Sequence, residues 1–257
     1  MNVTSIQMER TAISKTDATA HALTLADQAA SSDLILLPEM WPSGFFCFDR
    51  YPVDAEPIDG PVVQAFREKA AAIRSYILMG SIVERVKDKL FNTSLLIDPQ
   101  GNVAAVYRKI HLFGYQSSER DLLTRGTEVV VADTPWGRVG LATCYDLRFP
   151  EQFRKMVDLG AVLFLVVSAW PAARLEPWVI FNRVRAMENQ AFLVSSNCAG
   201  LDAGSRYAGN SMVVDPMGNV LARGDDRECL ITQAIDTDQV ASVRKEFSAL
   251  HDRVNLS

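Results

Sequence analysis

The sequence has little that would hold a metal ion or a disulfide framework. Only three histidines and four cysteines occur in 257 residues, and no Cys-x-x-Cys pair brings two thiols together. They lie far apart along the chain, at His21, His111 and His251 and at Cys47, Cys144, Cys198 and Cys229. Because zinc sites use closely spaced ligands, we expect none here, and in a reducing compartment the cysteines would be free thiols.

Clustered basic residues and long apolar runs are also missing, and no leader segment is predicted. The net charge is −5 and the basic residues are spread along the chain, so a nucleic-acid-binding surface is not predicted. The longest largely apolar run, residues 161–169, is about half of what a membrane-spanning helix needs. The N-terminal Met-Asn-Val-Thr-Ser lacks a charged segment followed by an apolar one. We therefore expect a cytoplasmic protein with neither nucleic acid nor membrane as a partner.

What the chain does contain is an element order that occurs twice. Each half shows strand, helix, strand, helix, strand and then a hairpin. In the first half we predict strands at 3–8, 34–38 and 76–84, helices at 14–30 and 61–74, and a hairpin over 91–107. In the second half we predict strands at 139–143, 162–167 and 191–197, helices at 150–159 and 177–190, and a hairpin around 211–220.

The two hairpins also share a turn. Ser94–Val103 and Ser211–Val220 agree at their Ser, Asp, Pro, Gly, Asn and Val positions, and Trp-Pro follows the second strand of both halves. Chance similarity of one turn is the alternative. Agreement in element order, turn and strand end together indicates an internal duplication.

The hairpins decide the fold class. Their strands need antiparallel neighbours, which excludes an open, fully parallel array. We predict an α/β fold of four layers, an α-β-β-α sandwich, in which two mixed sheets pack face to face and the halves are related by a pseudo-two-fold axis. No linker is visible, so residues 1–257 are predicted to form one domain. A strand at 228–235 and a helix from 238 toward 250 precede a polar tail, 250–257, which we expect at a contact with another subunit.

Cys144 is the central candidate for chemistry. It lies between the apolar strand 139–143 and a helix predicted to begin at Pro150. At a strand-to-helix corner the thiol lies at the edge of the sheet. Backbone N–H groups there point toward the group that the sulfur attacks. This is the geometry of a nucleophile. On spacing alone, a small buried apolar residue is the alternative.

Two further polar residues follow predicted strands. Glu39 comes after the apolar strand 34–38, and Lys109 comes directly after the first hairpin. If these strand ends converge with that of Cys144, the carboxylate can take the thiol proton and the ammonium favours the thiolate. The sulfur can then attack a carbonyl-like carbon, with Lys109 and the backbone N–H of Tyr145 stabilising the oxyanion.

Each residue has a simpler interpretation. Glu39 can pair a surface base at a strand end, Lys109 can be a solvated hairpin end, and His111 can be a hydrogen-bonded structural residue. The combination of polar residues abutting such apolar strands favours a site.

Three blocks of the chain, in this order, resemble the signature blocks of the nitrilase (carbon-nitrogen hydrolase) superfamily. They are Leu37–Glu39, Tyr107–Phe113 and Cys144–Glu151. The similarity continues through Arg183–Asn189 and Gly209–Gly218, so it covers essentially the whole chain.

The resemblance implies an α-β-β-α sandwich with a Glu-Lys-Cys triad at Glu39, Lys109 and Cys144. It implies a dimer in which the sandwich continues across subunits, and no metal or organic cofactor. It also assigns Glu119 as a second glutamate that positions the substrate amide. By sequence alone, Glu119 is a loop carboxylate expected to be solvated.

The residues after the cysteine indicate the branch. Nitrile-hydrolysing members resemble Cys-Trp-Glu there, whereas Cys-Tyr-Asp-x-Arg-Phe-Pro-Glu is similar to the amidase branch, which includes the ω-amidases acting on 2-oxoglutaramate. In that branch the residue matching Arg148 holds a substrate carboxylate, which suits the guanidinium fork. An ion pair with Glu151 or another helix residue is the alternative for Arg148. Trp170 is predicted to wall the pocket or to fill the core.

We therefore expect a cysteine-dependent amidohydrolase that cleaves the carboxamide C–N bond of a small, carboxylate-bearing substrate through a Cys144 thioester and releases ammonia. Its partners would be this small amide and a second copy of the chain, in a homodimer or higher homo-oligomer. An N-carbamoyl amino-acid or amine amidohydrolase and an aliphatic amidase are the enzyme alternatives. A binding protein on a retained hydrolase fold is the alternative from another class.

Overall fold

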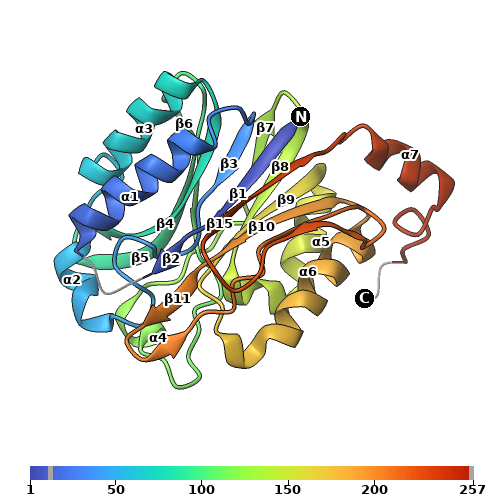
Figure 1. Ribbon diagram of the computed structural model, residues 1–257. Helices are drawn as coiled ribbons and strands as arrows, with labels where there is room; N and C mark the ends of the chain where they lie inside the picture. The colour runs from blue at the N-terminus through green and yellow to red at the C-terminus, as the bar shows by residue number, and fades with distance from the viewer. Residues whose placement is uncertain (11–13, 255–257) are drawn as a thin grey trace.

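Two six-stranded sheets form the centre of the computed structural model, which describes residues 1–10 and 14–254 (Figure 1). In order, the first sheet contains β15 (Cys229–Ala234), β1 (Asn2–Gln7), β3 (Leu34–Leu36), β4 (Tyr76–Val86), β5 (Lys89–Ile97) and β6 (Val103–Arg108). The second contains β14 (Val220–Arg223), β13 (Met212–Val214), β10 (Phe192–Asn197), β9 (Ala161–Ser168), β8 (Gly137–Thr143) and β7 (Val131–Thr134). Both sheets are mixed, as predicted.

The two sheets share one topology. In the first, β1, β3 and β4 are parallel, and the β4–β5–β6 meander is antiparallel. In the second, β8, β9 and β10 are parallel, and β10, β13 and β14 are antiparallel. In each sheet, the first parallel strand also pairs with an antiparallel neighbour on its other side. This neighbour is β15 for β1 and β7 for β8. The halves therefore repeat each other strand for strand.

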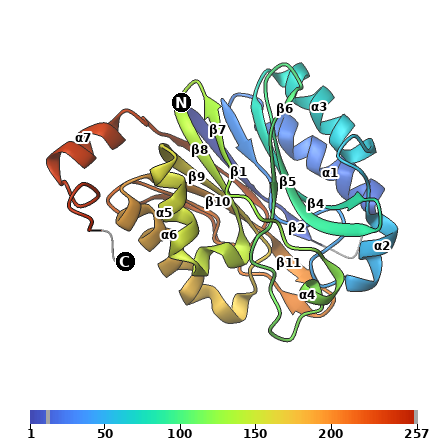
Figure 2. The same ribbon diagram turned by 180° about the vertical axis from the view of Figure 1, so that it is seen from behind.

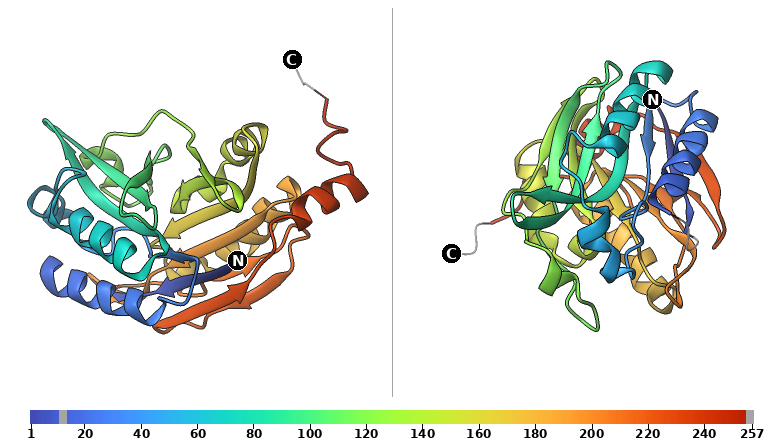
Figure 3. Two further views of the ribbon diagram at one scale, coloured as in Figure 1. Left: turned by 90° about the horizontal axis from the view of Figure 1, so that it is seen from above. Right: turned by 90° about the vertical axis from the view of Figure 1, so that its left-hand side faces the viewer.

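Helices cover the outer face of each sheet (Figures 2 and 3). The helices α1 (Lys15–Gln28) and α3 (Pro61–Ile73) pack on the first sheet, and α5 (Pro150–Asp158) and α6 (Leu175–Asn189) pack on the second. Between the sheets lies a buried apolar core to which Leu36 and Leu78 contribute from one side and Leu141 and Leu165 from the other. Burial of these side chains, about 1.5–3 kcal/mol each, holds the sheets together. The four-layer α-β-β-α fold is confirmed.

The repeated hairpin turn has the same hydrogen bonds in both halves. Asp98 Oδ1 accepts from the backbone N–H groups of the residues two and four positions later, and Asp215 Oδ1 does the same. The glycine in each turn has a positive φ, +80° at Gly101 and +82° at Gly218. An arginine of the preceding helix donates to each glycine carbonyl, Arg67 at 2.7 Å and Arg183 at 2.9 Å. The two turns thus have equivalent hydrogen bonds and backbone angles, which agrees with the duplication inferred from sequence.

The helix starts agree with their sequence signals. Ser14 caps α1 by accepting from the backbone N–H of Asp17, and Pro61 and Pro150 occupy the first turns of α3 and α5.

Several short elements had no sequence signal. They are α2 (Tyr51–Asp54), α4 (Glu119–Leu122) and a small sheet of β12 (Ser205–Arg206), β11 (Ala199–Asp202) and β2 (Glu9–Arg10). Elements of two to four residues are too short to show a period.

The C-terminal helix α7 (Gln239–Glu246) lies at the far edge of the second half (Figure 1). Of the tail expected at a subunit contact, residues 255–257 lie outside the described part of the chain. No helix within that described part has the length and apolar character needed to cross a membrane.

Candidate active site

Three elements bring Glu39, Lys109 and Cys144 to one place. Glu39 follows β3, Lys109 follows β6 directly, and Cys144 follows β8 directly. The Glu39 and Lys109 side chains are fully buried, and Lys109 Nζ donates to Glu39 Oε1 at 2.8 Å. Cys144 is 7% exposed, at the floor of a pocket. The candidate site thus combines strand ends of both halves.

Glu119 completes a buried charge cluster around Lys109. It opens α4 and is fully buried, so the solvated carboxylate expected from sequence alone is wrong. Lys109 Nζ donates to Glu119 Oε1 and Oε2 at 2.9 and 3.0 Å, and the Phe113 N–H donates to Oε2 at 2.7 Å. Two buried carboxylates therefore share one ammonium.

This cluster controls the protonation of its members. Burial by itself lowers the pKa of Lys109, but the charges of Glu119 and Glu39 outweigh it and hold the pKa above its ordinary value. Burial also raises the pKa of Glu119, against the lowering effect of Lys109. Lys109 is consequently a permanent cation in the site.

The Cys144 thiol is kept protonated. Burial, followed by the charge of Glu39, raises its pKa well above the ordinary value, and the lowering effect of Lys109 is smaller. The sequence argument that the ammonium favours the thiolate is therefore correct for the contribution of Lys109 alone. The net change in the pKa of Cys144 has the opposite direction, because burial and Glu39 outweigh Lys109. A thiol in this state needs a base beside it before it can attack.

The backbone at Cys144 is held in a strained conformation. Its φ is +48°, a left-handed value that costs a residue with a side chain about 1–3 kcal/mol. A 3-10 helix over Cys144–Arg148 separates β8 from α5 and was not predicted. Thr143 and Asp146 stabilise this corner by reciprocal side-chain to backbone hydrogen bonds.

Asp146 ties the corner to the Lys109 segment. Its fully buried carboxylate accepts from the Tyr107 hydroxyl at 2.6 Å and from the His111 N–H at 3.2 Å, and it contacts His111 Nδ1 at 2.8 Å. His111 also stacks on Phe149, with ring centroids 3.7 Å apart. These contacts show that His111 has the structural, hydrogen-bonded role considered from sequence.

Glu39 is oriented at both of its oxygens. Oε2 accepts from the Ala169 N–H at 2.9 Å, and Oε1 accepts from Asn92 Nδ2 at 2.8 Å in addition to Lys109. The same Asn92 amide donates to Glu119 Oε1 at 3.0 Å, so it links the two carboxylates. Sequence reasoning missed Asn92, because it is one of three consecutive polar residues in β5, with Thr93 and Ser94, and nothing local distinguishes it from them.

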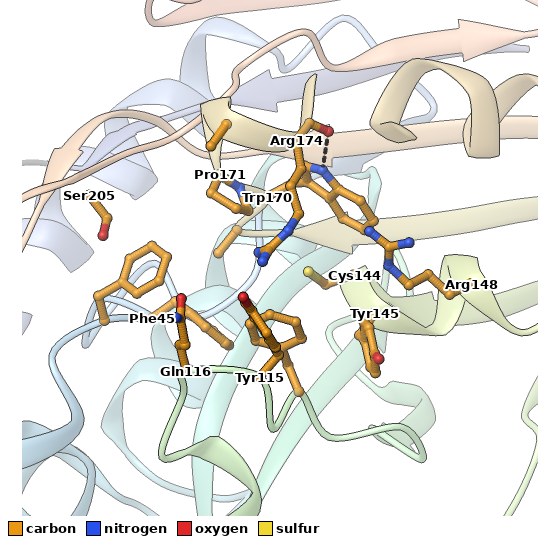
Figure 4. A pocket seen from close by; sticks show the side chains of 14 residues that line it. Phe45, Tyr115, Gln116, Cys144, Tyr145, Arg148, Trp170, Pro171, Arg174 and Ser205 are labelled. Carbon is orange, nitrogen blue, oxygen red and sulfur yellow. Dashed lines mark hydrogen bonds between the residues drawn. The ribbon is translucent and has the colours of Figure 1, made fainter. Parts of the chain in front are cut away.

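A cavity of about 450 Å³ opens above Cys144 (Figure 4). Its described walls include Tyr145, Arg148 and Trp170. Trp170 is nearly buried and donates from Nε1 to the Arg174 carbonyl at 2.7 Å, so it lines the pocket from a fixed position. Most of the lining residues are aromatic or otherwise apolar, which suits a small substrate with an apolar stem.

Arg148 points into this pocket without a carboxylate partner. No ion pair or hydrogen bond joins its guanidinium to any described residue, Glu151 included. Its Cζ instead lies 5.3 Å from the ring centroid of Trp170 and 5.1 Å from that of Phe181. The ion pair considered from sequence is not formed, and the cation is available to a ligand.

The described residues contain no group of three or more His, Cys, Asp and Glu side chains arranged to hold a metal ion.

Comparison with known proteins identifies the family. The model for carbon-nitrogen hydrolases matches residues 2–245. The chain belongs to the carbon-nitrogen hydrolase family.

Relatives place this carbon-nitrogen hydrolase among the amidases. The 2-oxoglutaramate amidase of Paenarthrobacter nicotinovorans is 34% identical over 237 residues, covering 89% of this chain and 81% of that protein. Omega-amidase NIT2 of Homo sapiens is 32% identical over 262 residues, covering 96% and 93%. The carbon-nitrogen hydrolase is thus an enzyme that hydrolyses non-peptide C–N bonds, as predicted.

A solved structure shows the same fold. XC1258 from Xanthomonas campestris, described as a CN-hydrolase superfamily protein with an arsenic adduct in the active site, superposes with a TM-score of 0.93. It is 30% identical, and the match covers 100% of this hydrolase and 98% of that chain.

Proposed function

We propose that this hydrolase is an ω-amidase-like enzyme that releases ammonia from a small amide carrying a carboxylate at its other end. The observation that carries the proposal is Arg148, a cation beside Cys144 with no carboxylate partner among the described residues. Arg148 is half-buried, and its contacts with aromatic rings leave its N–H edges free to donate to a carboxylate of the substrate. Relatives named 2-oxoglutaramate amidase and omega-amidase support this choice.

In the proposed reaction, Glu39 takes the proton of the Cys144 thiol as the sulfur attacks the carboxamide carbon. The carbonyl oxygen becomes an oxyanion, which Lys109 and the backbone N–H of Tyr145 stabilise. Glu39 then gives the proton to the departing nitrogen, so ammonia leaves and a thioester remains on Cys144. Glu39 next takes a proton from water as the water oxygen attacks the thioester carbon. The C–S bond then breaks, Glu39 returns the proton to the sulfur, and the acid leaves while the Cys144 thiol is restored.

Glu119 has a supporting role in this proposal. Its carboxylate holds Lys109 in place, and we assign it the positioning of the substrate amide because it matches the second glutamate that the resemblance implies. The Asn92 amide, which links Glu119 to Glu39, keeps both carboxylates at a set distance from the ammonium.

The substrate class is tested with a panel of amides. Ammonia release is compared for 2-oxoglutaramate, succinamate, simple aliphatic amides and N-carbamoyl amino acids. We expect turnover of the first two and a loss of about 10- to 100-fold in kcat/KM for these in Arg148→Met, the effect of losing a hydrogen bond to a charged group. Activity confined to neutral amides or carbamoyl compounds would remove the ω-amidase assignment in favour of those alternatives.

The nucleophile is tested by Cys144→Ala, which should lower kcat by about 10⁴-fold or more because no thioester can form. Cys229→Ala is the matched control, since this half-buried cysteine lies in β15 and has no role in the proposed chemistry. Mass spectrometry of acid-quenched wild-type enzyme should show an acyl group on Cys144. Undiminished turnover by Cys144→Ala would contradict the mechanism and favour a binding protein that retains the fold.

A further inference from the structure

The pocket contains a second arginine, Arg174, which the proposed reaction does not use. It ends the short 3-10 turn Ala172–Arg174 between β9 and α6. Its backbone is fixed, because its N–H donates to the Pro171 carbonyl at 3.0 Å and its carbonyl accepts from Trp170 Nε1. The turn therefore fixes where the Arg174 side chain begins, and its contacts with aromatic rings fix where the guanidinium lies.

The two arginines rest on different aromatic rings. The Cζ of Arg174 lies 5.4 Å from the ring centroid of Phe113 and 5.3 Å from that of Tyr115. The rings under Arg148 are those of Tyr145, Trp170 and Phe181. Figure 4 shows the two guanidinium groups on either side of Trp170, both directed toward the pocket. They are two separate cationic positions rather than one cluster.

Nothing in the described wall balances these charges. Neither Asp nor Glu occurs among the described residues that line the pocket. The guanidinium of Arg174, like that of Arg148, has no hydrogen bond or ion pair with any residue in 1–10 or 14–254. The nearby carboxylates of Glu39 and Glu119 are engaged by Lys109. A substrate with one carboxylate therefore brings a single negative charge to two guanidinium groups.

We propose that Arg174 forms a second acceptor subsite, so that the pocket selects amides whose tail carries another oxygen acceptor besides the carboxylate held by Arg148. Stacking on aromatic rings uses the faces of a guanidinium and leaves its N–H edges for an acceptor. The amides of 2-oxo dicarboxylic acids have the required group, and the plain monoamides of dicarboxylic acids lack it. This inference rests on the proposed function, since it concerns the same pocket and the same carboxamide.

The test uses two substrates that differ only at one carbon, 2-oxoglutaramate and glutaramate. The wild type should prefer the 2-oxo amide in kcat/KM. Arg174→Met keeps the stem on Phe113 and Tyr115 but removes the donors, and should lower kcat/KM for the 2-oxo amide by about 10- to 100-fold. Its kcat/KM for glutaramate should stay within about twofold, which also shows that the variant is folded.

Two further variants complete the design. Arg174→Lys keeps the charge without the fork and should retain part of the preference. Arg206→Met removes an exposed positive charge next to Ser205 at the pocket edge without touching the described lining, and should leave both substrates unchanged.

Three outcomes would overturn the inference. A wild type without preference for the 2-oxo amide contradicts it while leaving the proposed function intact. An Arg174→Met variant whose kcat/KM falls equally for both substrates, or for neither, also contradicts the inference and leaves the proposed function intact. A wild type that hydrolyses neither substrate but does hydrolyse carbamoyl compounds removes the inference and the proposed function together.

Discussion

Lys109 is the residue on which the charge balance of the site depends. It lies between two fully buried carboxylates and 5.3 Å from the ring centroid of Phe45. Removing one partner of a buried ion pair is strongly destabilising, at about 3–5 kcal/mol, because the other charge is left uncompensated. The cluster therefore links catalysis to stability, and conservative substitutions are the right probes of it.

At the scale of single residues, Cys47 also allows a prediction about how the reactivity of a thiol depends on pH. Burial and a hydrogen bond to Asp202, with Sγ to Oδ1 at 3.2 Å, raise the pKa of this half-buried thiol to about 11. A raised pKa keeps the thiol protonated, so iodoacetamide labelling of Cys47 should be slow at pH 8 and should rise until about pH 11. Peptide mass spectrometry after timed labelling across this pH range measures the profile.

A pair of variants isolates the cause. Asp202→Asn removes the charge that opposes the thiolate and should move the labelling profile of Cys47 to lower pH. Asp49→Asn should change it little, because Asp49 is the smallest of the contributions given for Cys47. An inflection near pH 9 in the wild type would contradict the prediction.

At the scale of elements, the bulge in β4 positions Glu39. The register between β4 and β5 shifts between Leu78 and Ser81, and Gly80 in this interval has a φ of +73°. A Cβ at Gly80 would lie 2.0 Å from the Pro38 carbonyl oxygen. Only glycine lets the end of β3 approach β4 this closely, so Gly80 is part of what orients the carboxylate.

We predict that Gly80→Ala is far more damaging than the same change at Gly204. Gly204 also has a positive φ, +80°, but a Cβ there meets nothing within 4 Å. Gly204→Ala should cost about 1 kcal/mol of unfolding free energy, and Gly80→Ala about 2–3 kcal/mol more, with a fall in kcat. Urea unfolding and amidase assays measure both, and equal effects of the two changes would contradict the close-packing argument.

At the scale of the molecule, the duplication reveals an asymmetry between the halves. The face of α6 and its hairpin turn exposes Ile180, Met187 and Met217, which are 48%, 51% and 53% exposed. The positions that match them in the first half, on α3 and its turn, are the exposed Gln64, Ala71 and Gln100. One framework thus presents a polar or small face in one half and an apolar face in the other.

We propose that this apolar face packs against a second copy of the chain in a homodimer. Sedimentation velocity should show a dimer for the wild type. Met187→Glu should shift it toward monomer, because a charge would be buried at the contact. Ala71→Glu, the same change at the duplicated position, should leave the dimer intact. A monomeric wild type, or equal effects of the two variants, would contradict the proposal.

Much of the architecture was predictable because it rests on local patterns. Apolar runs such as residues 162–167, helix starts at Pro61 and Pro150, and the repeated Asp-Pro-x-Gly-Asn turn each act over a few residues. Short elements such as α4 were missed, and with α4 the burial of Glu119. Its surroundings come from β5, β6 and the loop before it, which no local pattern reports.

The sequence by itself determined the order of strands and helices, the duplication and the polar residues that follow the central strands. Those features depend on the chemistry of neighbouring residues, so they can be read along the chain. Only the tertiary structure decided that Lys109 sits between two carboxylates, that the Cys144 thiol stays protonated and that Arg148 and Arg174 face the pocket without anions. Charge balance and burial depend on residues far apart in sequence, and only packing brings these together.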